Sequence, residues 1–395
     1  MNIGENAAQQ LSILEQSTAE VLPADGLRQK IETAIKENRP LRVKLGIDPT
    51  TSDVHIGHMV PYRKLRQFQD LGHTAVLIIG DFTAMIGDPT GKNRERPRLT
   101  FEQVKANTGT YCSQIFKVID ETKAEIHYQS SWFAQTSLEQ TIEMAAEFSV
   151  AHLLSHETFR SRIDSGERLS LHELFYPLLQ AWDSLQIRAD IEIGGMDQKF
   201  NILCGRDLQR NTGVEPQTAL FLPLLPGTDG KKMSKTGGNS INVLDPPEQM
   251  YGKVMSLPDG LLPEYISLAS SLRPEATEEP YALKKRLAKH IVETYHGSAS
   301  AIDAETYFRK TVSDKQIPDD IPCVNLLPGE YPIVGLITEN GLASSASEAR
   351  RLILQGGIRI NGERIADIHH VVSITSALCI TLQAGKRKYM KFECR

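Results

Sequence analysis

The residues best suited to chemistry lie in two loops that are far apart in the sequence. The first loop runs from Gly46 to His58 and is rich in small and polar residues. His55 and His58 are three residues apart, on one face of the helical turn that they open, so both imidazoles can donate hydrogen bonds to phosphate oxygens. Gly57 has no side chain and lets a planar base lie against the backbone. Because the start of a helix attracts anions, this loop predicts a phosphate site.

Other interpretations of this region fit less well. A metal centre would need a third ligand nearby or the glutamate of a His-Glu-x-x-His motif, and the sequence has neither. The stretch from Gly87 to Asn93 has one residue too few between its glycines for a P-loop, and Asn93 replaces the hydroxyl residue that holds magnesium. No Gly-x-Gly-x-x-Gly follows the first strand, which counts against a dinucleotide enzyme. We therefore predict no metal site.

The second loop runs from Asp229 to Asn239 and carries three amines in five residues. These are Lys231, Lys232 and Lys235, and glycines flank them. A lysine-rich loop on its own is usually a solvated surface. Paired with the histidine loop it becomes specific, because the two loops together would hold both ends of a triphosphate.

A third pattern lies on a predicted helix. Tyr176, Gln180 and Asp183 follow one another at spacings of four and three residues, which places them on one helix face. Together these side chains could line a pocket. The alternative is that an amphipathic helix shows this spacing by accident.

Hydrophobic patterns place these residues on an α/β scaffold. Residues 41–45 alternate as a short strand that leads into the first loop, and residues 75–79 form an apolar run typical of a buried parallel strand, with a helix between them. Pro61 fits that helix only if it begins a few residues earlier. Further strands are expected near 191–193 and 220–222. Helical periodicity covers residues 11–38, 101–123 and 137–189. The prediction is a doubly wound parallel sheet.

The C-terminal segment differs in charge from the rest of the chain. The net charge is −5, but from Tyr331 onward nine basic residues face five acidic ones, so the remainder is the more acidic part. Residues Ser345 to Gly362 predict a basic helix, a Gly-Gly turn, a short strand and an Asn-Gly hairpin turn. A basic module on an acidic body indicates contact with a polyanion such as RNA, and the alternative is a merely basic capping domain.

Composition narrows the class of protein. With 395 residues, 40% of them hydrophobic, the chain can form two or three globular domains. No apolar run approaches the roughly 18–20 residues of a membrane helix, and the N-terminus lacks the order of a secretory signal, so we expect a cytoplasmic protein with no membrane segment. The five cysteines are odd in number and widely spread, which argues against a disulfide framework or a zinc ribbon.

The two loops together carry a family resemblance. His-Ile-Gly-His at 55–58 and Lys-Met-Ser-Lys-Thr at 232–236 resemble the two signatures of class I aminoacyl-tRNA synthetases, with only Thr236 departing and keeping the hydroxyl group. The helix pattern at 176–183 looks like the tyrosine site of tyrosyl-tRNA synthetases, and residues 194–201 are similar to that family's ribose and substrate segment. The resemblance covers nearly the whole chain. Other bacterial members of the family place a tyrosine where this sequence has Lys44, and there it helps to bind the substrate hydroxyl.

The resemblance implies roles for individual residues. The implied catalytic residues are Thr50, His55, His58, Lys232 and Lys235. The implied ATP-binding residues are Gly57, Gly195, Asp197, Lys235 and Thr236. The implied tyrosine-binding residues are Lys44, Asp48, Asp88, Tyr176, Gln180, Asp183 and Gln198. The implied tRNA-binding residues are Arg350, Arg351, Arg359, Lys386, Arg387 and Lys388.

The resemblance also implies an activity and a domain order. The reaction would be activation of L-tyrosine with ATP, accompanied by Mg²⁺, followed by transfer of tyrosine to tRNA(Tyr), by a homodimer. A Rossmann-like catalytic domain with a helical insertion is expected over 1–245, a helical anticodon-binding domain over 246–316, a proline-rich linker over 317–332 and an RNA-binding domain similar to ribosomal protein S-four over 333–395. The alternatives are a tryptophanyl-type synthetase, a synthetase-derived RNA-binding or splicing factor, and a nucleotidyltransferase that does not use tRNA.

Overall fold

The computed structural model describes residues 6–90, 98–234, 237–275, 277–313, 321–375, 379–385 and 388–394. The chain divides into two compact units, and each is described by itself. The first unit comprises residues 1–245 and 256–287, and the second comprises residues 246–255 and 288–395.

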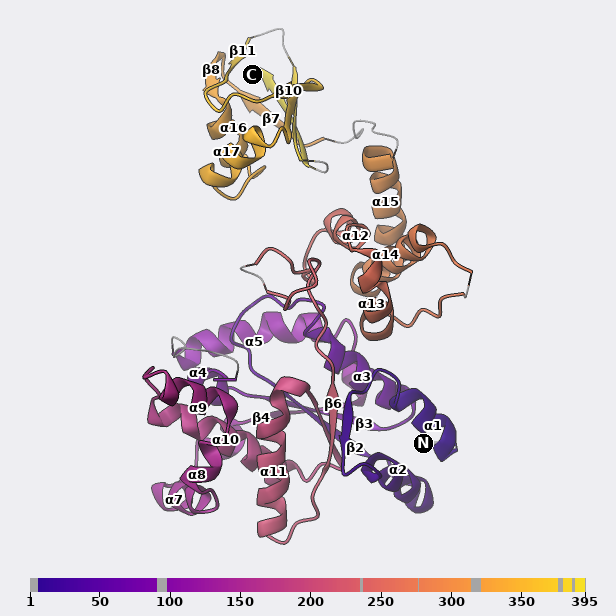
Figure 1. Ribbon diagram of the computed structural model, residues 1–395, viewed down its shortest axis with the longest axis vertical. Helices are drawn as coiled ribbons and strands as arrows, with labels where there is room; N and C mark the ends of the chain where they lie inside the picture. Colours follow the sequence, from indigo (N-terminus) through magenta and orange to yellow (C-terminus); the bar gives the residue numbers. More distant parts are fainter. Residues whose placement is uncertain are drawn as a thin grey trace. The chain divides into compact units, whose positions relative to one another are not determined.

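A six-stranded sheet forms the centre of the first unit (Figure 1). Its strands are β1 (Glu20–Leu22), β2 (Arg42–Ile47), β3 (Thr74–Ile79), β4 (Ala124–Tyr128), β5 (Ile191–Gly195) and β6 (Thr218–Leu222). The spatial order is β1-β6-β5-β2-β3-β4; β1 runs antiparallel to β6 and the other neighbours are parallel. The chain winds from β2 out to β4, then crosses to β5 and winds the other way to β6. The prediction of a doubly wound sheet is therefore confirmed.

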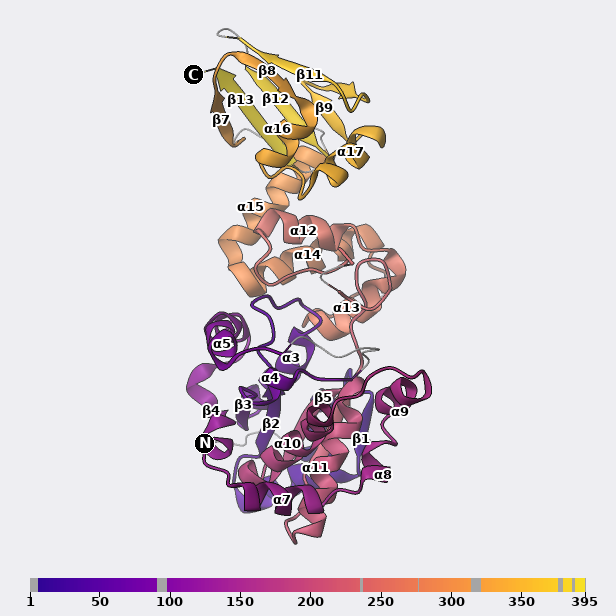
Figure 2. The ribbon, with the colours of Figure 1, turned by 90° about the vertical axis from the view of Figure 1, so that its left-hand side faces the viewer.

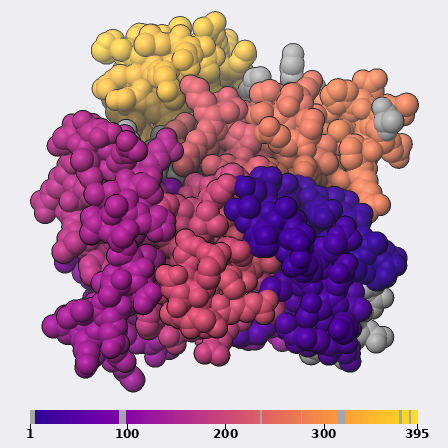
Figure 3. Space-filling view, turned by 60° about the horizontal axis from the view of Figure 1, so that its bottom comes forward, coloured from indigo at the N-terminus to yellow at the C-terminus, as the bar shows by residue number. Residues whose placement is uncertain are grey.

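Helices cover this sheet. Those of the first unit are α1 (Ala7–Leu14), α2 (Gly26–Glu37), α3 (Met59–Asp70), α4 (Thr83–Ile86), α5 (Phe101–Ile115), α6 (Ser130–Phe133), α7 (Leu138–Ala146), α8 (Val150–Leu153), α9 (Glu157–Asp164), α10 (Leu171–Ile187), α11 (Lys199–Asn211) and α13 (Leu262–Ala269). Because right-handed crossovers run in opposite directions from the centre, α3 on β2 and β3 and α11 on β5 and β6 cover opposite faces. The magenta segment with α7–α10 and the rose segment with α11 form one continuous surface (Figure 3).

The helices differ from the sequence expectation in their ends and breaks. α3 begins at Met59, which leaves Pro61 in the first turn, where its missing N–H costs nothing. The 11–38 segment forms α1 and α2 with the edge strand β1 between them, and the 101–123 segment ends as a helix at Ile115. The 137–189 segment breaks into four helices, of which only α10 is long. Local turns with their own caps, such as Ser137 and Ser149, produce these breaks.

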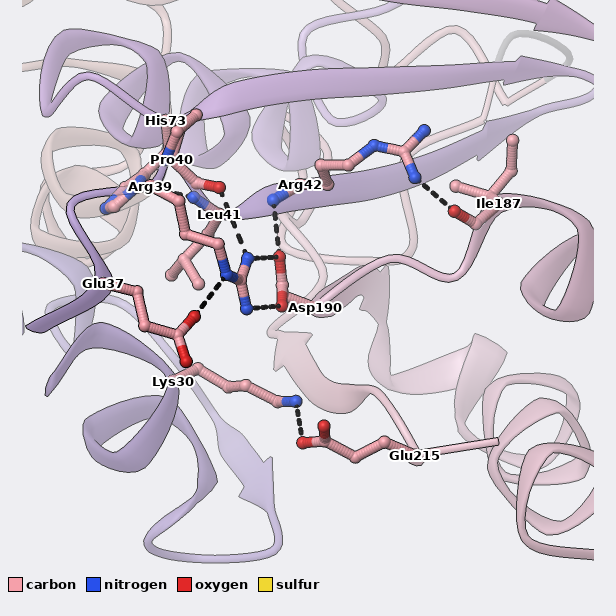
Figure 4. A network of polar contacts seen from close by, with 10 residues as sticks. All are labelled: Lys30, Glu37, Arg39, Pro40, Leu41, Arg42, His73, Ile187, Asp190 and Glu215. Atoms are coloured by element: carbon pink, nitrogen blue, oxygen red, sulfur yellow. Dashed lines mark hydrogen bonds and ion pairs between the residues drawn. The ribbon is translucent and has the colours of Figure 1, made fainter. Parts of the chain in front are cut away.

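A polar network ties the amino ends of β2 and β5 together (Figure 4). The Arg39 guanidinium donates to both oxygens of Asp190 at 2.9 Å, and the Arg42 backbone N–H donates to the same carboxylate at 2.9 Å. His73, buried beside this network, accepts the Leu41 N–H at Nδ1. These contacts fix the two central strands at the sheet edge opposite to their carboxyl ends, where ligands bind in folds of this class.

The second unit contains helices followed by a small α+β domain. Its helices are α12 (Pro247–Met255), the greater part of α14 (Pro280–His296), α15 (Ser298–Phe308) with a π-helical turn after it, α16 (Ile333–Glu339) and α17 (Ala346–Leu354). Its strands are β7 (Cys323–Leu326), β8 (Gly329–Pro332), β9 (Ile358–Ile360), β10 (Glu363–Ile365), β11 (Val371–Ile374), β12 (Ile380–Ala384) and β13 (Lys388–Cys394). The sheet order is β10-β9-β12-β13-β7, with β8 and β11 paired separately (Figure 2).

Two strands lie within the proline-rich stretch that the sequence suggests as a linker. β7 pairs in parallel with β13, and β8 pairs with β11. Pro322, Pro328 and Pro332 fall just before a strand, between the two strands and at a strand end, where a missing N–H is tolerated. The stretch therefore contributes an edge to the C-terminal sheet, whose core includes Ile337, Ile353, Leu382 and Phe392.

Candidate active site

A cavity of about 700 Å³ opens at the carboxyl ends of β2 and β5, where the sheet changes its winding direction. Parallel strands that diverge in this way leave a crevice at the top of the sheet. The cavity wall combines the loop after β2, the start of α3, one face of α10, the turn after β5 and the lysine loop. Predicted site residues on the wall are Asp48, Thr50, His55, Gly57, His58, Asp88, Tyr176, Gln180, Asp183, Gly195, Asp197, Gln198 and Lys232.

The histidine loop is held in place by strand-like backbone bonds. Ile56 N–H donates to Ile241 O at 2.9 Å and Val243 N–H donates to Val54 O at 2.8 Å. The residues after the lysine loop therefore run alongside the histidine loop, which brings the two sequence motifs together. A Cβ at Gly57 would lie 3.1 Å from His55 Nδ1, which is tighter than an ordinary contact, so glycine leaves room for the imidazole.

The two imidazoles stack on each other with ring centroids 3.5 Å apart. The His58 N–H donates to the His55 carbonyl at 2.9 Å and is shared with His55 Nδ1 at 3.3 Å, an arrangement that favours the tautomer with the ring proton on Nε2. Burial lowers the pKa of His55 to about 4. Desolvation by the surrounding protein, and then the nearby His55 and Lys232, lower the pKa of His58 to about 3. The side chain is nevertheless open to the cavity. Both rings are therefore neutral hydrogen-bond donors at pH 7.

Asn239, which the sequence analysis missed, fastens the base of the lysine loop. Its Oδ1 accepts the Ser234 N–H at 2.8 Å, while its Nδ2 donates to Asp229 Oδ1 at 2.7 Å and to the Lys232 carbonyl at 3.1 Å. These bonds position Lys232 at the cavity. Lys235 and Thr236 lie outside the described residues.

Asp48 and Tyr176 meet at one side of the cavity. Tyr176 Oη donates to Asp48 Oδ2 at 2.7 Å, and Thr83 Oγ1 donates to Asp48 Oδ1 at 2.7 Å. A Cβ at Gly80 would lie 2.2 Å from Asp48 Oδ1 and 2.3 Å from Thr83 Oγ1, so only glycine at the end of β3 leaves room for this pair. Neither Thr83 nor Gly80 was singled out by the sequence pattern.

Asp88 and the turn after β5 form another part of the wall. Gln198 Nε2 donates to Asp88 Oδ2 at 2.7 Å. Burial, and then the neighbouring Asp88, raise the pKa of Asp197. Gly195 allows the Asp197 carboxylate to fold back, since a Cβ there would lie 2.5 Å from its Oδ1. This side of the cavity thus presents two acidic groups and an amide.

Asp183 lies at the inner end of the α10 face and is only 3% exposed. Its carboxylate accepts hydrogen bonds from Gln129 Nε2 at 2.7 Å and from Trp132 Nε1 at 3.1 Å. Burial raises the pKa of Asp183 to about 7, against the opposing charge of Lys44. Gln129 and Trp132 follow β4, a strand that lies between the predicted helical segments 101–123 and 137–189 and that the sequence periodicity did not predict. Recognising β4 would have pointed to Gln129, because residues just beyond a parallel strand reach the site edge.

Lys44 is the one predicted site residue in the described chain of this unit that does not reach the cavity wall. Its side chain is fully buried, and its Nζ lies 3.0 Å from Glu192 Oε1 and 2.8 Å from Ser184 Oγ. The ammonium group therefore points behind the pocket, toward β5 and α10.

The predicted tRNA-binding residues that the structure describes are all exposed in the second unit. Arg350 and Arg351 lie on α17, Arg359 on β9 and Lys388 on β13; Lys386 and Arg387 lie outside the described residues. Lys388 Nζ donates to the Leu342 carbonyl at 3.0 Å. Arg364, not among the predicted residues, packs so close to Gly356 that a Cβ there would touch its guanidinium. It thereby links the end of α17 to the β9–β10 hairpin.

Comparisons with known proteins identify the family of this chain. The family described as tRNA synthetases class I (W and Y) matches residues 36–313, and the family described as tyrosine–tRNA ligase SYY-like C-terminal domain matches residues 314–392. Tyrosine–tRNA ligase 2 of Clostridium acetobutylicum is 43% identical over 399 residues, covering 98% of this chain and 99% of that protein. Tyrosine–tRNA ligase of Symbiobacterium thermophilum is 44% identical over 395 residues, covering 96% of each.

Solved structures share the fold. A C-terminally truncated mitochondrial tyrosyl-tRNA synthetase from Aspergillus nidulans matches with a TM-score of 0.63 and 20% identity, over 77% of this chain and 94% of that one. The tyrosyl-tRNA synthetase from Archaeoglobus fulgidus, complexed with L-tyrosine, matches with a TM-score of 0.60 and 23% identity, over 76% of this chain and 100% of that one. No described helix has both the length and the apolar character of a membrane span.

Proposed function

Because the chain belongs to the class I tRNA synthetases of the tryptophan and tyrosine group, we propose that it is a tyrosine–tRNA ligase. It activates L-tyrosine with ATP to tyrosyl-adenylate and pyrophosphate, and then transfers tyrosine to the 3′ end of tRNA(Tyr). The observation that carries the choice of tyrosine is the buried Asp183 carboxylate at the inner end of the pocket, held by Gln129 and Trp132. A phenol hydroxyl can donate to it, whereas the benzene ring of phenylalanine has no donor. An indole N–H could also donate, so the choice of tyrosine over tryptophan is supported instead by the relatives named tyrosine–tRNA ligase.

The first step is an in-line displacement that needs positioned charges and no covalent nucleophile. A carboxylate oxygen of tyrosine bonds to the α-phosphorus of ATP as the bond to the pyrophosphate oxygen breaks. In our proposal Thr50, His55 and His58 donate to the triphosphate, and Lys232 and Lys235 neutralise the departing pyrophosphate. His55 is neutral with its proton on Nε2, and this state supports the role. A neutral ring can donate a hydrogen bond to a phosphate oxygen and needs no carboxylate partner of its own.

The substrate amino acid would be oriented by the acidic and amide groups of the wall. We assign Asp88, Tyr176 and Gln180 to the tyrosine ammonium group, Asp48 and Gln198 to positioning it, and Asp197 to the ribose of ATP; Gly57 and Gly195 leave room for the nucleotide. The Gln198 to Asp88 bond of 2.7 Å and the Tyr176 to Asp48 bond of 2.7 Å support the first assignment, because they orient both carboxylates.

Mg²⁺ belongs to this proposal as a companion of ATP. Among the described residues, no three or more His, Cys, Asp or Glu side chains are grouped to hold a metal ion. The donor set thus fits an ion whose ligands are mainly phosphate oxygens and water, which is how Mg²⁺ is usually bound with nucleotides. When bound, it would neutralise phosphate charge.

Binding of tRNA is proposed for the basic residues of the second unit. Arg350, Arg351, Arg359 and Lys388 are exposed on α17 and the adjoining strands, a helix and hairpin arrangement suited to phosphates of structured RNA. Lys386 and Arg387 are adjacent in sequence to Lys388 and are included in the proposal.

We further propose a homodimer that works in the cytoplasm with its tRNA. The support for a dimer is a set of exposed apolar side chains in the helical insertion and at the start of α10. They are Leu138, Ile142, Val150, Ile163 and Leu171, with exposures from 48% to 77%. They lie on the successive helices α7 to α10, and we propose that the partner subunit covers this apolar part of the surface. Sedimentation equilibrium of the purified chain is expected to give twice the 44.0 kDa chain mass.

The activity is tested by exchange of labelled pyrophosphate into ATP with each amino acid. We expect exchange with tyrosine and little with tryptophan or phenylalanine. Asp183→Asn should reduce the preference for tyrosine over phenylalanine, because sites that hydrogen-bond a substrate hydroxyl reject analogues without it by about 10⁴–10⁵-fold, tyrosyl-tRNA synthetases being the known case. Stronger exchange with tryptophan, or none with tyrosine, would refute the proposal.

A further inference from the structure

Lys44 lies behind the substrate pocket with each of its ammonium donors facing an acceptor. Nζ is 3.0 Å from Glu192 Oε1, 2.8 Å from Ser184 Oγ and 3.5 Å from the Gln180 carbonyl oxygen. Ser184 directly follows Asp183 on α10, and Gln180 lies three residues before it. The lysine therefore binds α10 on both sides of the residue that closes the pocket.

Glu192 is the ion-pair partner and is itself 1% exposed. Its Oε2 accepts from Ser184 Oγ at 3.2 Å and from Gln217 Nε2. Glu192 also contributes to the cavity wall beside Asp183. Two carboxylates are thus buried near one ammonium group, and the direct hydrogen-bond donors to Asp183, Gln129 and Trp132, are neutral.

We propose that Lys44, paired with Glu192, is a positioning and specificity-determining residue that sets the orientation and charge of Asp183 without touching the substrate. The inference rests on the proposed function, since it gives Asp183 the phenol as its ligand. Lys44 holds the turn of α10 from Gln180 to Ser184, which points the Asp183 carboxylate into the pocket. Its charge offsets one of the two buried carboxylates, and Glu192 prevents it from neutralising Asp183 completely.

The electrostatic surroundings of Asp183 support this balance. Burial raises the pKa of Asp183, Lys44 on β2 opposes that rise, and Glu192 on β5 adds to it. The neighbours after β4 are Gln129 and Trp132, which carry no charge. Since an opposite charge nearby favours the ionised carboxylate and a like charge disfavours it, removing Lys44 and removing Glu192 must shift the Asp183 titration in opposite directions.

This opposite response separates a charge-setting role from a merely structural one. Lys44→Met is expected to move the titration of Asp183 up by about one pH unit or more, and Glu192→Gln is expected to move it down by a similar amount. Gln217 can accommodate the second change, because its Oε1 has no hydrogen-bond partner and an amide flip would present it to the amide introduced on β5. A packing defect alone would move neither titration, or both in the same direction.

Trp132 provides a readout that requires no substrate. Its Nε1 donates to Asp183 Oδ1 at 3.1 Å, so its fluorescence responds to protonation of that carboxylate. The chain has two tryptophans, and in a Trp182→Phe background only Trp132 emits. The emission of the full-length protein is followed from pH 5 to pH 9 in the parent, in Lys44→Met, in Glu192→Gln and in the double variant.

Two controls make the assignment secure. His127 is another ionisable side chain near the reporter, with its ring centroid 6.5 Å from that of Trp132, so the inflection assigned to Asp183 must disappear in Asp183→Asn. Lys64→Met removes another buried lysine, whose Nζ donates to the Leu14 and Gln16 carbonyls away from the pocket. It is expected to lower the melting temperature and to leave the Trp132 inflection in place.

The same shifts are then sought in catalysis. In pyrophosphate exchange, the acid limb of kcat/KM for tyrosine should move with the Trp132 inflection, while kcat at high pH changes less than threefold. If Lys44→Met does not fold, the inference is tested by Glu192→Gln alone, and a downward shift of the Asp183 titration in that variant supports it. Inflections that stay in place, or that move together, overturn it. Absence of tyrosine-dependent exchange in the parent would refute the proposed function and leave the fluorescence result to stand by itself.

Discussion

His55 shows how one backbone contact sets the chemistry of a side chain. The His58 N–H donates to the His55 carbonyl at 2.9 Å and also reaches Nδ1 at 3.3 Å, which favours the tautomer with the ring proton on Nε2. We predict that His55→Ala lowers kcat for adenylate formation by about 10²–10³-fold, the usual cost of one preorganised donor to developing charge, with little change in tyrosine affinity. Stopped-flow measurement of adenylate formation checks this. A variant with normal kcat and weakened tyrosine binding would contradict the assignment.

His73 makes stability depend on pH. It is 2% exposed, accepts the Leu41 N–H at Nδ1 and pairs with Gln10 Oε1 at 2.9 Å through Nε2. Burial lowers the pKa of His73 to about 4, below its value of about 6.5 in an unfolded chain. Between these two pH values the unfolded state therefore binds one more proton than the folded state. Above pH 6.5 the titration of His73 does not change the free energy of unfolding. As the pH falls from 6.5 toward 4, it lowers that free energy by up to about 1.4 kcal/mol per pH unit.

The corresponding experiment uses His73→Gln. Between pH 6.5 and 4 its free energy of unfolding should fall less steeply than that of the parent, by about one proton's slope, although it starts lower at pH 7. Urea titrations followed by the fluorescence of Trp132 and Trp182 report on the first unit, which contains both. His369→Gln, at an exposed site in the second unit, is the control. Parallel pH profiles for parent and His73→Gln would contradict the prediction.

At the scale of elements, the lysine loop depends on Asn239. Asn239→Asp replaces the Nδ2 donor with an oxygen that faces the Asp229 carboxylate and the Lys232 carbonyl. We expect kcat for adenylate formation to fall by about 10–100-fold through displacement of Lys232, with tyrosine KM unchanged within a factor of three. Asn340→Asp, which loses a comparable bond to Leu336 O in the second unit, should leave exchange at the parent rate. Equal rates of adenylate formation for Asn239→Asp and the parent would show that the hydrogen bonds of Asn239 are not needed to position Lys232.

The elements differ in how far their sequence predicts them. β3 is predicted because five successive apolar residues, from Ala75 to Ile79, are buried on both faces of the sheet. β1 and β4 are missed, since a three-residue edge strand and the half-buried Ala124–Tyr128 segment carry little period-two signal. The consequence reaches the site, because Gln129 and the neighbouring Trp132 are invisible without β4.

At the scale of the whole molecule, the structure moves the point at which the RNA-binding module should be removed. β7 pairs with β13, so a cut at residue 333, where the sequence predicts the module to begin, would leave β7 without its partner. Deletion of residues 321–395 is expected to preserve tyrosine-dependent pyrophosphate exchange and to weaken tRNA charging. The dependence of tRNA KM on salt should become shallower, since fewer phosphate contacts release fewer counter-ions.

A full-length variant provides the matched comparison. Arg350→Ala with Arg351→Ala removes two exposed charges from α17 and leaves the fold of the module intact. This variant should reproduce part of the loss in tRNA charging, while its tyrosine-dependent pyrophosphate exchange stays at the parent rate. Unchanged charging in both proteins, measured from low to physiological salt, would remove the module from tRNA recognition.

The histidine loop and the lysine loop are far apart in the sequence, and the fold of the chain brings them together. The sequence predicts that the histidine loop and the lysine loop meet because each has suitable chemistry, and the cavity that both line agrees with that expectation. The backbone bonds of Ile56 and Val243 that hold them side by side carry no side-chain signature and could not be foreseen. Lys44 is placed among the tyrosine-binding residues by the family resemblance alone, because it occupies the position of a substrate-binding tyrosine, and that resemblance does not say which layer a buried lysine ammonium reaches.

Tyr176 Oη and Thr83 Oγ1 both donate to Asp48, the Thr83 backbone N–H donates to Gln129 Oε1, and Gln129 Nε2 donates to Asp183. These hydrogen bonds form one unbroken line across the pocket. A redesign of the pocket for a bulkier or non-natural amino acid would start from the groups around the ring. Here such a change at Asp183 frees Gln129 to turn, and the disturbance travels to the groups around the backbone of the incoming amino acid. Libraries that vary both ends of this line together should therefore yield active enzymes more often than libraries restricted to the ring.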